Sequence, residues 1–506
     1  MTGQGAAGSL TLETESDVFS DASQALERAV MRCGGPMTEP AKQIAELVAR
    51  ARHAQAVLNS YTQDQVDLIT GAIVYHLSQP KMASHIAEMA FEETGMGLVE
   101  SKRAKLAQKM PAIFHDIRKE PTVGVIDRDT ANGITTIAKP YGVIAALVPS
   151  TNCEATPIFK AVLGIRARNA VICAPHPASK KTTLYVVEVI RQVLRAMNAP
   201  EDLVLCIETP SKALAGELMA QCDVSMATGS GDMVHAAYSA GKPAYGVGVG
   251  NAAVIVDETV DHAETAEKIR IGKTGDNASG CSAENSIIVQ SSIYDGFLTA
   301  LEAEGAHIAS DEEKAKLRAV LWENGHVSRK VVARPVEEIA AVAGIELKPG
   351  TRFFVVEETG TGADHPFSGE KLSLVLTCYK YDNFDEAIGL VNAITEYSGS
   401  GHSCGIHSND ADRILRLGLE TRTSRVIVRQ PHGVANSGSW ANGLAKTFSL
   451  GCGSWGGNSI SENVTQKHYY NTTRIAEPLG HPVPDDQAIY GALLDRIAAM
   501  RIGAEA

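Results

Sequence analysis

The sequence lacks several features that define common classes of protein. It has no apolar run that approaches the roughly 18 residues needed to cross a bilayer, and its best stretch covers residues 142–148. It has no basic excess, because 46 Lys and Arg stand against 59 Asp and Glu and give a net charge of −13. A chain with this balance is not expected to bind nucleic acid or an anionic membrane surface.

The marks of an exported protein are also missing. The nine cysteines are scattered, odd in number and form no Cys-x-x-Cys pair, which indicates reduced thiols. The first residues carry no basic start followed by an apolar core, and contain Glu13, Glu15 and Asp17 instead. We therefore expect a cytoplasmic protein with no membrane segment.

Standard nucleotide and metal motifs are absent. There is no Walker A loop, and the glycines of residues 229–231 are not followed by the third glycine of a dinucleotide fingerprint. His402, Cys404 and His407 lack a fourth ligand at zinc spacing, so they are interpreted as loop or core residues. No metal site is predicted.

Strand and helix patterns alternate in the first half of the chain. Helical stretches such as 179–196 and 231–240 separate apolar runs that are typical of buried strands. These runs are at 143–148, 170–173, 202–207, 224–227 and 253–256. The alternation predicts a parallel sheet with helical crossovers, the usual architecture for binding nucleotides.

The flanking segments have other patterns. Residues 39–58 show helical spacing, and Thr62 with Gln65 forms a capping box that begins a second helix. β-branched residues flank a turn between 122 and 139, which predicts a β-hairpin. A second α/β section runs from about 262 to 445.

Three segments carry residues suited to covalent chemistry. Residues 149–152 read Pro-Ser-Thr-Asn and follow an apolar strand. Residues 276–285 read Asp-Asn-Ala-Ser-Gly-Cys-Ser-Ala-Glu-Asn, and residues 450–459 read Leu-Gly-Cys-Gly-Ser-Trp-Gly-Gly-Asn-Ser. Because Cys281 lies among Asn, Ser and Gly rather than in an apolar run, its position favours exposure and reactivity.

Together with further matches in the same order, these segments resemble the aldehyde dehydrogenase superfamily, and its CoA-acylating branch in particular. The further matches are residues 158–160, 174–177 with Lys180 and Lys181, 241–244, 246–251 and 370–373. The resemblance covers about residues 40–476. It implies the α/β aldehyde dehydrogenase fold, with a Rossmann-like nucleotide domain, an α/β catalytic domain and a β oligomerisation arm.

The resemblance also implies a division into domains. The expected parts are a disordered extension at 1–38, a dinucleotide-binding domain at 39–121 and 140–260, a catalytic domain at 261–450, an oligomerisation arm at 122–139 and 451–476, and a C-terminal segment at 477–506. Because an unprotected strand edge in the arm invites association, we expect a homodimer or a homotetramer.

By the same resemblance, Cys281 is the nucleophile that attacks an aldehyde. The Asn152 side chain and the Cys281 backbone N–H are the expected oxyanion donors. Hydride then passes to a nicotinamide, and CoA releases the acyl group from the thioester. From the residues alone, Cys281 is also compatible with a buried core thiol, and Asn152 with a helix N-cap.

One position separates the acylating branch from its hydrolytic relatives. In those enzymes, a Glu just before a Gly-Gly turn activates water, and Val247 takes the place of that Glu here. The loss of this base favours CoA as the acyl acceptor. Glu284, three residues after the nucleophile, is expected to be an orienting or surface group. A hydrolytic aldehyde dehydrogenase and an inert scaffold that kept the fold are the alternatives.

The resemblance implies contacts with NAD or NADP. The candidates follow strand ends or open helices, where nucleotides and phosphates bind in open sheets; they are Ser150, Thr151, His176, Lys180, Gly229, Ser230, Gly248 and Glu370. Glu370 is expected at the nicotinamide ribose, and His176 with Lys180 at the adenosine end. No acid stands in the loop before Lys180, which favours NADP slightly.

Residues 425–447 would line the aldehyde pocket in this family. The segment is polar and holds Arg429, His432 and Trp440, of which the first two are suited to an anionic tail. The chain also resembles acylating sulfoacetaldehyde dehydrogenases. We therefore expect a short anionic aldehyde, with sulfoacetaldehyde as the leading case. Acetaldehyde or another short aldehyde is the alternative, in which Arg429 and His432 are surface residues.

Overall fold

The computed structural model describes residues 38–323 and 325–500 of the chain. The predicted extension at 1–38 therefore lies outside the described residues, apart from Thr38. That residue caps the first described helix, because its side chain accepts a hydrogen bond from the Ala41 N–H.

A group of helices opens the described chain: α2 (Glu39–Leu58), α3 (Gln63–Ser78), α4 (Pro80–Thr94), α5 (Val99–Ala104) and α6 (Met110–Ile117). The predicted capping box is confirmed, since Thr62 and Gln65 exchange hydrogen bonds at the start of α3. One π-helical turn, Lys105–Lys109, separates α5 from α6. Such turns often occur at functional sites.

The smaller sheet is parallel and has the strand order β5-β4-β3-β6-β7. Its strands are β3 (Val143–Val148), β4 (Ala170–Pro175), β5 (Val204–Cys206), β6 (Val224–Thr228) and β7 (Ala244–Val247). The helices that connect and flank them are α7 (Thr156–Arg166), α8 (Lys180–Ala196), α9 (Lys212–Gln221) and α10 (Gly231–Ser239). The chain order reverses between β3 and β6, which is the switch point where open sheets bind nucleotides.

The larger sheet is also parallel and has the order β10-β13-β14-β9-β8-β15-β16. Its strands are β8 (Ala252–Val256), β9 (Glu284–Gln290), β10 (Ala306–Ile308), β13 (Phe353–Glu357), β14 (Val375–Tyr381), β15 (Cys404–His407) and β16 (Val426–Val428). Its helices are α11 (His262–Thr274), α12 (Tyr294–Ala303), α13 (Asp311–Leu321), α14 (Val336–Ala343), α15 (Phe384–Tyr397), α16 (Ala411–Glu420) and α17 (His432–Ala435). A small ribbon, β11 (Trp322–Glu323) with β12 (His326–Val327), lies beside it.

Two strands differ from the sequence expectations. The run 253–256 was grouped with the nucleotide-binding strands, but β8 pairs with β9 and β15 in the larger sheet. The fifth strand of the smaller sheet is β7, which the sequence pattern did not reveal. Its residues, Ala-Tyr-Gly-Val, do not form a continuous apolar run.

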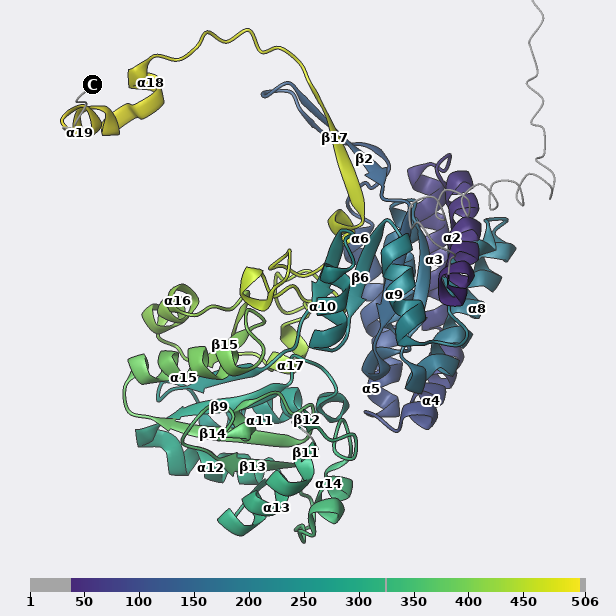
Figure 1. The fold of residues 1–506 in the computed structure, drawn as a ribbon. Helices are drawn as coiled ribbons and strands as arrows, with labels where there is room; N and C mark the ends of the chain where they lie inside the picture. Colours follow the sequence, from purple (N-terminus) through teal and green to yellow (C-terminus); the bar gives the residue numbers. More distant parts are fainter. Residues whose placement is uncertain (1–37, 324, 501–506) are drawn as a thin grey trace, which may run out of the picture.

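A separate antiparallel sheet projects from the smaller one (Figure 1). The predicted hairpin is present as β1 (Gly124–Asp129) and β2 (Ile134–Pro140), and β17 (Tyr470–Ala476) pairs with the other edge of β2. Of the predicted arm segment 451–476, only β17 joins this sheet. The chain then extends away from the body to the short helices α18 (Asp486–Tyr490) and α19 (Leu494–Ala498).

The two parallel sheets face each other end to end. Residues 248–251 lead from the carboxyl end of β7 to the amino end of β8. The carboxyl ends of the strands in the smaller sheet therefore adjoin the amino ends of the strands in the larger sheet. Within the described ranges, no helix is long and apolar enough to cross a membrane.

Candidate active site

The predicted nucleophile stands in a strained loop at the amino end of β9. Three consecutive residues before it, Asp276, Asn277 and Ala278, have positive φ values of 49°, 51° and 57°. Non-glycine residues adopt this conformation only where surrounding contacts fix it. The Asp276 carboxylate supplies such contacts, because it accepts hydrogen bonds from the Leu98 N–H and the Ser279 hydroxyl. Cys281 follows and is half-buried.

His402 makes a polar contact with the nucleophile. Its Nε2 lies 3.2 Å from the Cys281 Sγ, and its Nδ1 lies 2.7 Å from the Ser403 Oγ. Burial lowers the pKa of His402 well below its ordinary value, and the charges of Arg425 and His432 add to this effect. The ring is therefore neutral at pH 7.

The sequence interpretation grouped His402 with Cys404 and His407 and so missed its position. Cys404 instead contacts the Thr423 hydroxyl at 3.3 Å, and His407 is buried at the end of β15. In the part of the chain that the structure describes, no group of three or more His, Cys, Asp or Glu side chains could hold a metal.

Arg425, at the amino end of β16, is the arginine beside the nucleophile. Its guanidinium donates to the Asn436 Oδ1 at 3.0 Å, the His402 carbonyl at 2.7 Å and the Ser461 carbonyl at 3.1 Å. Burial raises the pKa of the Cys281 thiol to about 12, with Glu370 raising it further and Arg425 opposing the rise. Arg425 thus supplies the positive charge that favours the thiolate.

Glu370 lines the same small cavity as Cys281. Its carboxylate accepts a hydrogen bond from the Gly250 N–H at 3.1 Å. Burial raises the pKa of Glu370 to about 8. A side chain at position 250 would collide with the Cys281 carbonyl, so this glycine is required by close approach. The expected nicotinamide end of the cofactor site therefore adjoins the nucleophile.

Asn152 is tied to the nucleophile loop through a lysine of the π-helical turn. The Lys105 Nζ donates to the Asn152 Oδ1 at 2.5 Å and to the Asp276 Oδ2 at 2.6 Å. Because an ammonium group only donates, it directs the amide oxygen toward itself and leaves the Asn152 Nδ2 available as a donor. The N-cap of α7 is Ala155, so Asn152 does not cap that helix.

The remaining nucleotide candidates share one edge of the smaller sheet, because each follows the carboxyl end of a strand. Ser150 and Thr151 follow β3, and His176 and Lys180 follow β4. The other three are Gly229 and Ser230 after β6 and Gly248 after β7. Ser230 is exposed and opens α10, and its side chain makes no capping hydrogen bond there. These positions flank the switch point and fit a nucleotide whose phosphate lies at a helix N-terminus.

One contact at the adenosine end was missed from the sequence. The Glu93 carboxylate, on α4, accepts hydrogen bonds from the backbone N–H groups of Lys181 and Thr182, each at 2.8 Å. It therefore occupies the N-terminus of α8, next to Lys180. The sequence spacing gave no signal for this contact, since 88 residues separate Glu93 from Lys181.

The three expected substrate residues do not gather around Cys281. Arg429 is exposed, and its guanidinium donates to the Ser408 carbonyl at 2.6 Å. Trp440 is 70% exposed and packs under the Lys446 ammonium group. His432 is buried behind the nucleophile, where its Nδ1 lies 2.7 Å from the Ser282 carbonyl.

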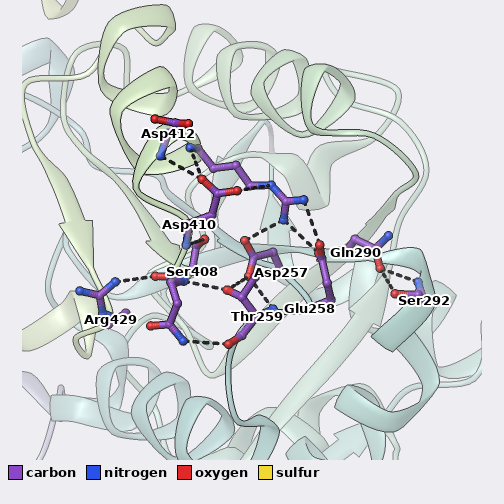
Figure 2. Close-up of polar contacts among 11 residues, drawn as sticks. Asp257, Glu258, Thr259, Gln290, Ser292, Ser408, Asp410, Asp412 and Arg429 are labelled. Atoms are coloured by element: carbon purple, nitrogen blue, oxygen red, sulfur yellow. Dashed lines mark hydrogen bonds and ion pairs between the residues drawn. The ribbon is translucent and has the colours of Figure 1, made fainter.

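Figure 2 shows where Arg429 lies. It belongs to a polar network at the carboxyl ends of β8, β15 and β16, in which Asp257 accepts from Arg413 at 2.9 Å. Cys281 precedes β9, at the amino edge of the same sheet. Because the sheet is parallel, the network and the nucleophile lie at opposite ends of its strands. Of the two arginines, Arg425 is therefore the one on the same side of the sheet as Cys281.

Lys109, at the end of the π-helical turn, is a second cation near the nucleophile. Its Nζ donates to the Ser437 hydroxyl and lies 4.9 Å from the Phe448 ring centroid. Burial, followed by the charge of Lys105, lowers the pKa of Lys109 to about 7, while a Cys281 thiolate would raise it. Among the ion pairs of the described residues, neither Lys109 nor Arg425 has a carboxylate partner.

Comparison with known proteins identifies the family of the chain. The aldehyde dehydrogenase family model matches residues 22–342, and the chain belongs to that family. Within it, the chain is an oxidoreductase of the acylating aldehyde dehydrogenase branch.

Three relatives illustrate the similarity. An acylating sulfoacetaldehyde dehydrogenase of Cupriavidus necator is 40% identical over 91% of this chain and 94% of its own length. A succinate-semialdehyde dehydrogenase (acetylating) of Clostridium kluyveri is 41% identical, over 85% of this chain and 95% of its own. An acetylating aldehyde dehydrogenase from Geobacillus thermoglucosidasius, known from a crystal structure, is 35% identical to this chain, with a TM-score of 0.85. The match covers 88% of this chain and 98% of that one.

Proposed function

We propose that this enzyme converts a short anionic aldehyde, CoA and NAD or NADP to the acyl-CoA and the reduced nucleotide. Sulfoacetaldehyde, which gives sulfoacetyl-CoA, is the leading substrate. The observation that carries the substrate class is the pair of cations near Cys281, Lys109 and Arg425, which have no carboxylate partner among residues 38–323 and 325–500. Arg425 is buried and Lys109 is half-buried. A cation held out of water without a counter-charge is costly unless an anion joins it.

The residues divide the chemistry as follows. The Cys281 thiolate adds to the aldehyde carbon, and the carbonyl oxygen becomes an oxyanion. We assign the Asn152 Nδ2 and the Cys281 N–H as the donors to this oxygen. The nicotinamide, when bound, accepts the hydride, and Cys281 is left as a thioester. The CoA thiol gives up its proton to solvent, and its thiolate then takes the acyl group and releases the Cys281 thiolate.

The acceptor is CoA rather than water because a base is missing. Val247, in the place of the hydrolytic Glu, is buried at the end of β7 and has no proton acceptor. The names of the two curated relatives also specify acylating or acetylating enzymes. If the enzyme were hydrolytic, Glu370 would be the candidate base that activates water, since it lines the nucleophile cavity.

The anionic substrate class has independent support from the relatives. Sulfoacetaldehyde carries a sulfonate, and succinate semialdehyde carries a carboxylate. The relatives from Cupriavidus necator and Clostridium kluyveri are therefore named for aldehydes with an anionic tail. Lys109 and Arg425 are cations suited to bind either group.

The test compares initial rates of NADH and NADPH formation with sulfoacetaldehyde, succinate semialdehyde and acetaldehyde, each with and without CoA. We expect strict CoA dependence and preference for an anionic aldehyde. Lys109→Met should raise the KM for the anionic aldehyde roughly tenfold and leave acetaldehyde unchanged, because one charge-assisted contact is lost. Arg429→Met is the matched control and should change neither.

Two outcomes would contradict this proposal. Turnover without CoA would indicate hydrolysis, with Glu370→Gln as the variant that identifies the base. Equal activity on acetaldehyde and on the anionic aldehydes would remove the role of Lys109.

For the nucleotide, we infer that Lys180 contacts the adenosine end. Lys180 favours the 2′-phosphate of NADP, whereas the nearby Glu93 carboxylate disfavours it. The same assay shows which effect is larger. Lys180→Ala should raise the KM for NADP more than that for NAD.

For the assembly, we infer a homodimer or homotetramer built through the β1-β2-β17 sheet. Strand β17 is exposed, and among the described strands it pairs on one side only, with β2. An open strand edge is a ready template for a second chain. Light scattering of the purified protein gives the number of chains.

A further inference from the structure

Four buried side chains form a hydrogen-bonded row that ends at the nucleophile. In order, they are Arg425, Asn436, Ser403 and His402, and the sulphur of Cys281 follows. Arg425 is 6% exposed and the other three are fully buried. Buried polar groups must find partners inside the row, so the direction of each hydrogen bond can be worked out.

The first two residues fix their own direction. A guanidinium group has donors and no acceptor, so the Asn436 atom that faces the Arg425 Nε at 3.0 Å is the amide oxygen. The Asn436 Nδ2 then faces two serines and donates to Ser403 Oγ at 2.9 Å and to Ser282 Oγ at 3.0 Å. Both amide protons are used.

Ser403 therefore receives one hydrogen bond and has one proton to donate. Its hydroxyl has two polar neighbours in the described structure, the Asn436 Nδ2 and the His402 Nδ1. The first is a donor and cannot accept. The His402 Nδ1, at 2.7 Å, is the acceptor that remains. A buried hydroxyl without an acceptor would be costly, which disfavours the reverse direction.

We propose that Asn436 and Ser403 are positioning residues that hold His402 as its Nε2–H tautomer, so that His402 donates a hydrogen bond to the Cys281 sulphur. This inference rests on the proposed function only in taking Cys281 as the nucleophile. The row transfers no proton. It presents one fixed N–H to the sulphur when the thiolate attacks the aldehyde and again when CoA displaces it.

The surrounding charges support a neutral ring. Arg425 and His432 are the ionisable groups that face His402, besides Cys281 itself. His432 is neutral at pH 7, because burial lowers its pKa to about 4. A positive ring would place a second cation beside Arg425 and would turn the Ser403 proton away from its acceptor. His402 is thus a donor, and the CoA thiol must lose its proton to another group.

The direct test is the ¹⁵N spectrum of histidine-labelled full-length enzyme, in which protonated and bare ring nitrogens give separate signals. The His402 signal is assigned by its loss in His402→Gln. We expect a neutral ring with Nε2 protonated. Asn436→Asp replaces the donor with an acceptor of the same shape, so the row should reverse and the proton should move to Nδ1.

A second measurement reports on the sulphur. The rate of Cys281 alkylation by iodoacetamide against pH gives the reactivity of its thiolate. Ser403→Ala should lower this rate at pH 7 about threefold to tenfold, because the fixed N–H is released. The matched control is Ser225→Ala, in β6. Ser225 is also fully buried, and its hydroxyl has no partner in the described structure. In Ser225→Ala, Cys281 should therefore be alkylated at the wild-type rate.

The proposal is overturned if wild-type His402 carries its proton on Nδ1, or if Asn436→Asp leaves the tautomer unchanged. Equal alkylation rates in Ser403→Ala and the wild type would also overturn it. None of these measurements uses aldehyde, CoA or nucleotide. Failure of the acylating reaction and failure of the proposed tautomer are therefore distinguishable.

Discussion

At the scale of single residues, burial disfavours the thiolate form of the nucleophile, and specific neighbours favour it. Burial raises the pKa of Cys281 to about 12, which would leave almost no thiolate at pH 7. Arg425 opposes this rise by its charge, and His402 lies 3.2 Å from the sulphur. The reactivity of this thiol thus depends on residues that come from two loops of the larger sheet.

Lys109 gives a pH prediction at this scale. Its pKa is lowered to about 7, so its charge is present below pH 7 and is lost as the pH rises through that value. We expect kcat/KM for sulfoacetaldehyde, divided by kcat/KM for acetaldehyde, to fall roughly fivefold to tenfold between pH 6 and 8. Ionisation of Cys281 affects both substrates and cancels in this ratio.

Rate profiles of the two aldehydes over this range provide the measurement, with Lys109→Met as the control. In that variant the ratio should be low and independent of pH. A wild-type ratio that does not change with pH would show that Lys109 does not contact the anion.

At the scale of elements, helix α7 holds the two central strands of the smaller sheet together. Its Lys160 is buried, and the Nζ donates to the Leu147 carbonyl of β3 at 2.5 Å and to the Met226 carbonyl of β6 at 2.7 Å. These strands flank the switch point of the sheet. The lysine that the sequence showed only as part of a motif thus joins the strand ends that position Asn152 and the nucleotide candidates.

We expect Lys160→Met to lower the free energy of unfolding by about 1–3 kcal/mol, because two buried carbonyls lose their donor. Urea unfolding followed by circular dichroism measures this change. The control is Lys212→Met at the exposed first turn of α9, which should have almost no effect. An equal midpoint for both variants would show that the Lys160 contacts do not stabilise the sheet.

What the sequence could predict follows from the range of the interactions. Strands β3, β4 and β6 and the position of Cys281 depend on local patterns, namely buried runs and a glycine- and asparagine-rich loop. The positions of His402, Arg425 and Lys109 depend on segments that meet only in the folded chain. Lys109 reaches the site from a π-helical turn, which no helical periodicity reveals. The sequence interpretation names Arg429 for the aldehyde pocket and does not single out Arg425, because the sequence does not show at which end of the strands each residue lies.

At the scale of the whole molecule, the C-terminal residues have two different relations to the body. Strand β17 pairs along its full length with β2. The residues after Ala476 are almost all exposed, and several are large and apolar, such as Val483, Leu493 and Met500. Figure 1 shows this segment directed away from both parallel sheets.

Two truncations separate these relations. A chain that ends at Ala476 should keep its thermal midpoint within about 2 °C, because within one chain almost nothing packs on the removed segment. A chain that ends at Tyr469 also loses β17 and should dissociate or melt earlier. Calorimetry and light scattering measure both effects. Dissociation after the shorter truncation would instead show that the exposed segment covers a second copy.

The short passage at residues 248–251 has a consequence for redesign. It divides the enzyme into a half that carries most of the coenzyme candidates and a half that carries Cys281, His402 and Arg425. If the residues after β4 contact the coenzyme as proposed, we expect substitutions there to alter the choice of coenzyme without disturbing the thiol and its neighbours. Residues 248–251 must be kept in any enzyme that combines the two halves from different sources, because Gly250 lies against the backbone of Cys281.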